Sequence, residues 1–153
     1  MRFCSINIYS GEEKDGDRKR KLTGMLRRDS DHVVDLYLQS FKYYNNDICI
    51  SLNIECDEKI DTPFVEPKIL QKGYPVLHIP FDLNNYCAIS DKSSHWMKVI
   101  RDSIDYVCEL WDWDKSFFDD VYGRFSQALS SDHPNMSKGK MENENYENTK
   151  KRI

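Results

Sequence analysis

The sequence offers one pair of residues whose types suit nucleophilic catalysis, Cys87 and His95. A thiol that is activated by a nearby imidazole can attack an electrophilic substrate. The local sequences typical of cysteine peptidases are missing, however, and no further catalytic partner is visible. The competing interpretation is structural: a buried cysteine, followed by a histidine in the first turn of a helix. A small hydrolase or transferase based on these two residues is therefore kept as the alternative function.

Other patterns of catalytic and metal sites are missing. The histidines are scattered along the chain, at His32, His78, His95 and His133. None of them is spaced from a second histidine, a cysteine or a helical carboxylate pair in a way that would complete a set of metal ligands. No glycine-rich phosphate loop and no Gly-x-Ser-x-Gly motif occurs. The neighbours Asp119 and Asp120 diverge by about 100° on a helix, so they form no acid/base dyad. We therefore predict a protein with no catalytic residue, no metal and no cofactor.

The segment from Glu109 to Asp114 (ELWDWD) is the most unusual in composition, because it places two tryptophans among carboxylates. An aromatic side chain surrounded by charges is typical of a protein-binding surface that pairs with lysine or arginine. The competing interpretation is that Trp113 closes the end of the core and that the acids favour the start of the next helix. The partner-binding residues predicted here are Trp113, Asp112, Asp114, Asp119 and Asp120.

A second candidate surface is the acidic loop that holds Glu55, Asp57, Glu58, Asp61 and Glu66. Outward residues of a predicted hairpin, such as Tyr37, Tyr43 and Tyr44, would accompany it. An ordinary solvated loop is the competing interpretation. From this loop we predict partner contacts by Asp57, Glu58 and Asp61.

Charge is distributed unevenly along the chain. Residues 29–129 hold nine Lys and Arg against eighteen Asp and Glu, a net charge of −9, whereas residues 1–28 hold eight against four, a net charge of +4. Nucleic-acid binding depends on basic residues that neutralise phosphates, so an acidic body argues against it. The basic run Arg18–Lys21 with Arg27 and Arg28 could be a nucleic-acid patch or a localisation signal. Its acidic flanks and glycines favour a solvated, mobile loop between two strands, and its role is left open.

Five cysteines at irregular spacing predict reduced, buried thiols in the cytoplasm. No stretch approaches the roughly 18 apolar residues of a membrane span, and residues 1–5 lack the apolar region of a signal peptide. The expectation is a cytoplasmic protein that binds no membrane and is a monomer or a weak homodimer.

Hydrophobic periodicity predicts strands first and helices later. Alternation indicates strands at residues 2–9, 32–43 and 47–55, the last two as a hairpin turning at Asn45 and Asn46. Residues 56–68 are predicted to form a loop, and Gly73–Phe81, bounded by prolines, is predicted to be an edge strand or an extended segment. Residues 82–92 are expected to turn the chain toward its helices.

A period of 3.6 residues predicts a helix from Ser93 to Trp111, with Trp96, Ile100, Ile104, Val107 and Trp111 on its buried face. A second helix is predicted from an N-cap at Asp114 to Leu129. Residues 130–153 are polar and predict a disordered tail. The predicted fold class is α+β, a mainly antiparallel sheet of about four strands with two C-terminal helices on one face, in a single domain over residues 1–129.

This layout resembles small bacterial immunity proteins of polymorphic toxin systems. The resemblance rests on strands, an apolar segment, an amphipathic helix ending in Glu-Leu-Trp-Asp-Trp-Asp, and a short helix beginning Asp-Lys-Ser-Phe-Phe, over about residues 30–129. It implies a non-enzymatic protein that binds a cognate toxin domain, often through an acidic face, and blocks it. The basic run at residues 18–28 departs from a uniformly acidic inhibitor. The predicted function is therefore toxin inhibition by binding to a basic protein surface, and the identity of the partner is left open.

Overall fold

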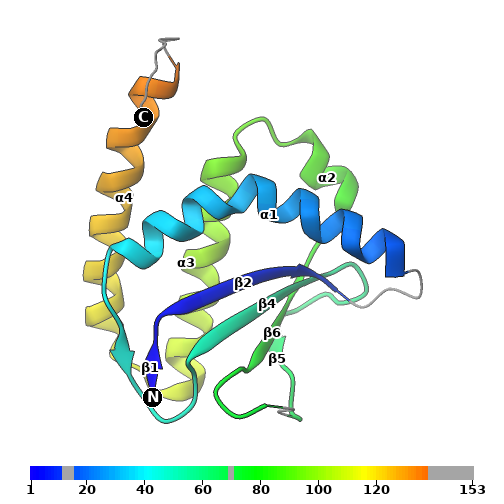
Figure 1. The fold of residues 1–153 in the computed structure, drawn as a ribbon. Helices are drawn as coiled ribbons and strands as arrows, with labels where there is room; N and C mark the ends of the chain where they lie inside the picture. Colours follow the sequence, from blue (N-terminus) through cyan, green and yellow to red (C-terminus); the bar gives the residue numbers. More distant parts are fainter. Residues whose placement is uncertain (12–15, 69–70, 138–153) are drawn as a thin grey trace. The chain divides into compact units, whose positions relative to one another are not determined.

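The computed structural model describes residues 1–11, 16–68 and 71–137 of the chain. Its elements confirm an α+β protein (Figure 1). The helices are α1 (Gly16–Gln39), α2 (Leu83–Ala88), α3 (Lys92–Trp111) and α4 (Lys115–Ser137). The strands are β1 (Arg2–Phe3), β2 (Ser5–Ser10), β3 (Tyr44–Asn45), β4 (Ser51–Asp57), β5 (Phe64–Val65) and β6 (Val76–Pro80).

The main sheet has the strand order β2-β4-β6-β5, and its first three strands run parallel. Only β5 is antiparallel to its neighbour, and β1 and β3 form a separate antiparallel pair. The prediction of a mainly antiparallel sheet was therefore wrong. Helix α1 provides the crossover that parallel β2 and β4 require, in the place where the sequence predicted a basic loop and a strand.

Helix α1 forms because its buried, mostly apolar residues follow the helical period. Leu26, Ser30, Val33 and Tyr37 lie four, three and four residues apart and are buried. The β-branched and aromatic residues of 32–43 had favoured a strand, but this face packs the helix against β2. The predicted hairpin is wrong for the same reason. The chain does turn at Asn46. The side-chain Oδ1 of Asn46 accepts hydrogen bonds from the backbone N–H groups of Ile48 and Cys49.

One face of the sheet forms the core. Residues Ile6, Ile8, Leu52, Ile54 and Leu77 alternate inward along three strands and are buried. The register places Ile8 beside Ile54 and Ile54 beside Leu77. Strand β6 is flanked by strands on both sides, so the prediction of an edge strand at Gly73–Phe81 was wrong. The structure tolerates its prolines because Pro75 precedes the strand and Pro80 ends it.

Helix α3 confirms the strongest helix prediction to within one residue of its start. Asp91 caps it by accepting a hydrogen bond from the backbone N–H of Ser94. Trp96, Ile100, Ile104 and Val107 are buried as expected, whereas Trp111 is half-buried. Asp112 ends the helix in the left-handed conformation, with φ of 54°, and so turns the chain away from the helical path.

The chain divides into two compact units, Met1–Lys115 and Ser116–Ile153. Helix α4 continues to Ser137, past the predicted end at Leu129, so residues 130–137 are helical rather than tail. The rest of the predicted tail lies outside the described residues, and a single domain over residues 1–129 stays a prediction. None of the helices in the described part of the chain has the length and apolar character that crossing a membrane requires.

Candidate functional site

The second face of the sheet carries polar side chains. In β4, Asn53, Glu55 and Asp57 alternate with residues of the core and are only partly buried. Parallel pairing places Glu55 directly beside His78 of β6. Because residues opposite one another in a sheet share a face, the carboxylates of β4 and the imidazole of β6 meet on this open face.

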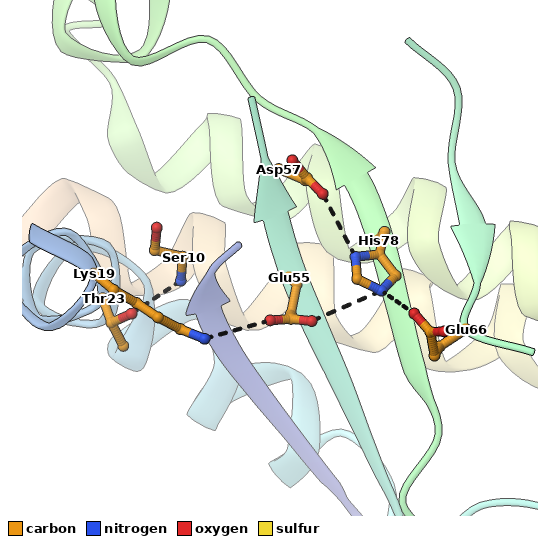
Figure 2. Close-up of polar contacts among 7 residues, drawn as sticks. All are labelled: Ser10, Lys19, Thr23, Glu55, Asp57, Glu66 and His78. Carbon is orange, nitrogen blue, oxygen red and sulfur yellow. Dashed lines mark hydrogen bonds and ion pairs between the residues drawn. The ribbon is translucent and has the colours of Figure 1, made fainter. Parts of the chain in front are cut away.

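His78 is the centre of this group, and only 9% of its surface is exposed. Its Nε2 lies 3.0 Å from Oε2 of Glu66 and 3.7 Å from Oε2 of Glu55. Its Nδ1 faces Oδ2 of Asp57 at 3.8 Å (Figure 2). Three carboxylates therefore surround one imidazole, and we call Glu55, Asp57, Glu66 and His78 the acidic cluster.

An aromatic ring fixes the orientation of His78. The antiparallel pairing of β5 and β6 places Phe64 opposite His78, and their rings stack at a centroid distance of 4.5 Å and an interplanar angle of 11°. Glu66 follows two residues after Phe64, so its side chain lies on the same face. The two-residue strand β5 thereby positions both the stacking ring and the third carboxylate.

The N-terminal part of α1 borders the cluster. Thr23 of α1 accepts a hydrogen bond through Oγ1 from the backbone N–H of Ser10, which holds the helix against the end of β2 (Figure 2). Nζ of Lys19 consequently lies 3.8 Å from Oε1 of Glu55. The strand end itself is closely packed, because a Cβ on Gly11 would lie 3.0 Å from Cα of Asp57.

The cluster lines a cavity of about 450 Å³, a size in the range of small-molecule sites. Its walls are formed by Lys19, Asn53, Glu55, Asp57, Glu66, Lys68, Gln71, Tyr74, Val76 and His78. Three carboxylates stand against two lysines, so the cavity carries a net charge of −1 when His78 is neutral. Among the residues that the structure describes, no group of His, Cys, Asp and Glu side chains is arranged to hold a metal ion. The arrangement is suited to binding a positively charged group.

At the helix junction, Trp113 is buried, as the interpretation that it closes the end of the core predicts. Trp113 is only 7% exposed and packs against Phe3, Tyr44 and Trp111, with ring centroids 5.1–5.3 Å apart. Its backbone N–H donates to the carbonyl of Cys108, in the turn that Asp112 makes possible. Asp112 and Asp114 are exposed beside it. The burial of Trp113 leaves little of its surface for a partner, although contact by these residues stays a prediction.

The remaining predicted contact residues fall in three places. Asp119 and Asp120 are exposed in the early part of α4, in the second unit. Asp57 belongs to the acidic cluster. Glu58 forms an ion pair with Arg18 at 3.2 Å, and both Glu58 and Asp61 line a separate, shallow hollow of about 390 Å³. Of the predicted acidic loop, the structure thus brings Glu55, Asp57 and Glu66 together around His78.

Cys87 and His95, the alternative catalytic pair, lie in different surroundings. Cys87 is exposed on α2, whereas His95 lies with Tyr86 and Trp96 in the lining of a cavity of about 180 Å³ that Cys87 does not line. The pKa of His95 is lowered, first by burial and then by Lys92 and Lys98. Cys49, Cys56 and Cys108 are buried as predicted, but Cys4 and Cys87 are exposed.

Sequence reasoning missed His78, Lys19 and Tyr74 as site residues. His78 had been counted only as one of four scattered histidines. The polar alternation Asn53, Glu55, Asp57 was a signal for the open face, but linking it to His78 required the parallel pairing of β4 with β6. Lys19 required helix α1, which was predicted as a loop.

Comparisons of the chain with protein-family models, with curated proteins and with solved structures find no match.

Proposed function

We propose that this chain is a non-enzymatic binding protein that inhibits a cognate bacterial toxin domain, and that the cavity at the acidic cluster receives a basic part of that toxin. The observation that carries the proposal is the convergence of Glu55, Asp57 and Glu66 on one buried imidazole in a cavity of about 450 Å³. The toxin as partner comes from the resemblance to immunity proteins.

Electrostatics supports a basic partner. The stretch 29–129 carries a net charge of −9 and residues 1–28 carry +4, so residues 1–129 together carry −5. This net negative charge attracts a positively charged surface and raises the rate of association. The carboxylates of Glu55, Asp57 and Glu66 outnumber the two lysines in the cavity lining, which favours a positively charged group there. The acidic cluster thus lies where a basic side chain would be guided.

Exposed aromatic residues at the same place support a protein interface. Tyr74 lines the cavity and is 36% exposed, and Phe64, stacked on His78, is 37% exposed. Tyrosine and other aromatic residues next to charged groups are typical binding hot spots. These two rings, rather than the buried Trp113, offer the aromatic contact that the sequence analysis assigned to the helix junction.

The test is protection by co-expression. We expect the reading frame immediately upstream of the gene to encode a toxin-like domain. That domain is expressed in a bacterial host with this chain, with its Glu55→Gln/Glu66→Gln variant, or with Asp31→Asn/Asp35→Asn. The last variant removes the same charge from exposed positions on α1. We expect growth with the wild type and the α1 variant, and lost protection with the cavity variant. Cell death in the presence of the wild-type chain would contradict the proposal.

The second candidate is a small hydrolase or transferase that uses Cys87 and His95. The lowered pKa of His95 favours it, because a general base must be neutral to accept a proton. Turnover of a substrate that Cys87→Ser or His95→Ala abolishes would support this candidate. It would also contradict the proposal of a purely binding protein.

A further inference from the structure

We infer that the group recognised by the cavity is a guanidinium, so the partner inserts an arginine side chain between Glu55 and Glu66 and against Tyr74. This inference rests on the proposed function, since it names the chemistry of the partner at the same site. It specifies that the basic group of the partner that enters the cavity is an arginine side chain.

The acidic cluster leaves hydrogen-bond acceptor positions open. Glu55 and Glu66 both direct a carboxylate oxygen at Nε2 of His78, at 3.7 and 3.0 Å. One imidazole nitrogen carries at most one proton, so it donates to one of the two carboxylates. Each ionised carboxylate has about four acceptor positions. The histidine therefore satisfies only a small part of the acceptor capacity that faces the cavity.

A second observation points to an external ligand. His78 is nine-tenths buried in the lining of the cavity, and its Nδ1 makes no hydrogen bond with any residue that the structure describes. The oxygen of Asp57 that it faces lies 3.8 Å away, beyond hydrogen-bonding distance. A buried histidine placed among three carboxylates without completing its own hydrogen bonds marks a polar site that is unsatisfied within residues 1–11, 16–68 and 71–137.

The shape of the donors decides between arginine and lysine. A guanidinium presents several N–H groups in a planar fork, so it can donate to Glu55 and Glu66 together, whereas an ammonium acts as a point charge. Its planar face also stacks on aromatic rings. Tyr74 supplies an exposed ring in the same cavity. Two carboxylates and one aromatic wall match the guanidinium better than the ammonium.

The lysines at the cavity are compatible with this ligand. Lys19 is 38% exposed in its side chain and lies 3.8 Å from Glu55, which makes a loose, solvent-screened pair. An arriving guanidinium with better geometry can replace it, because a solvated lysine loses little on returning to water. An anionic ligand would instead meet the carboxylates of Glu55, Asp57 and Glu66 in the lining of the cavity.

The experiment titrates the full chain with a small probe at low salt. Binding is monitored through the amide chemical shifts in ¹H–¹⁵N spectra. The probe is Nα-acetyl-arginine amide, compared with the citrulline analogue, which is neutral but similar in shape, and with the lysine analogue. We expect saturable shifts in β4, β6 and residues 64–66 with the arginine probe. The citrulline probe should bind at least about tenfold more weakly, because charged hydrogen bonds contribute roughly 1.5–3 kcal/mol each.

Variants locate the binding. Glu55→Gln and Glu66→Gln should each weaken the arginine probe by about tenfold or more, and Asp35→Asn, on the exposed face of α1, should leave it unchanged. Equal binding of the citrulline or lysine probe, or no saturable shift at the cavity, would overturn the inference. A toxin complex without arginine binding would overturn this inference alone. Arginine binding without toxin protection would contradict the proposed function and leave the guanidinium site standing.

Discussion

Glu55 and His78 lie opposite one another in the parallel pairing of β4 and β6, with Oε2 of Glu55 3.7 Å from Nε2 of His78. The strand register alone creates this neighbourhood, because successive side chains of a strand point to opposite faces. A shift of one residue would place Glu55 beside Leu77 in the core. The packing of Ile54 and Leu77 on one face therefore fixes the acidic cluster on the other.

His78 should contribute measurably to stability. His78→Ala removes the Nε2 hydrogen bond to Glu66 and the stacking on Phe64, and it leaves three carboxylates close together. We expect a loss of about 1–3 kcal/mol in the free energy of unfolding, measured by urea denaturation. Glu66→Gln should cost less, because its side chain is 41% exposed. Equal stability of the wild type and His78→Ala would contradict this account of the cluster.

Tyr86 joins three helices through its hydroxyl group. Trp96 Nε1 donates to Tyr86 Oη at 2.9 Å, and Tyr86 donates to Asp29 Oδ2 at 2.6 Å. Tyr86→Phe leaves the buried indole N–H without its acceptor, so we expect a loss of about 1–3 kcal/mol in thermal or urea unfolding. Tyr106→Phe, on the half-buried side of α3, serves as the control and should change stability by less than about 0.5 kcal/mol.

The thiols should differ in reactivity. Burial raises the pKa of Cys49 and of Cys56 to about 12, so both remain protonated at neutral pH, and Cys108 is also buried. Since the thiolate is the nucleophile, iodoacetamide at neutral pH should label only the exposed Cys4 and Cys87 in the folded protein. Mass spectrometry of peptides reads the labelled positions. Rapid labelling of Cys56 in the native state would show that β4 is not packed as described.

His95 should make stability depend on pH. Burial, Lys92 and Lys98 lower its pKa from 6.5, so just below pH 6.5 the unfolded chain binds more protons at this residue than the folded chain. The free energy of unfolding should therefore fall as the pH drops from 6.5 toward the pKa of the folded state. The melting temperature of His95→Gln should decline less over that range. Identical declines in both proteins would exclude a contribution from His95.

The elements predicted correctly are those with local signals. Helix α3 follows from its 3.6-residue period and the cap at Asp91. Helix α1 was missed although Leu26, Ser30, Val33 and Tyr37 follow the same period, because its charges and the residues at 32–43 favoured a loop and a strand. The parallel pairing of β2, β4 and β6 depends on contacts between distant residues, and no local pattern specifies them.

The site was predictable only in part, because local sequence patterns show its carboxylates but do not show which strands pair. Glu55, Asp57 and Glu66 stand out in sequence as an acidic segment, but His78 joins them only through the β4–β6 register. Trp111 is half-buried rather than buried, and Trp113 is buried, as the interpretation that it closes the end of the core predicted. The left-handed residue Asp112 ends the helix, so the helical period cannot be extended to Trp113, which turns into the aromatic group around Phe3 and Tyr44.

Carboxyl footprinting of the complex tests most directly whether the acidic cluster binds the partner. The chain, alone and with the toxin domain, is labelled with carbodiimide and glycine ethyl ester, and the modified peptides are quantified. Glu66, 41% exposed in its side chain, should lose most of its reactivity in the complex, while the exposed Asp35 on α1 keeps its own. Unchanged labelling of Glu66 together with protection of Asp112, Asp119 and Asp120 would contradict the account and assign binding to the helix junction.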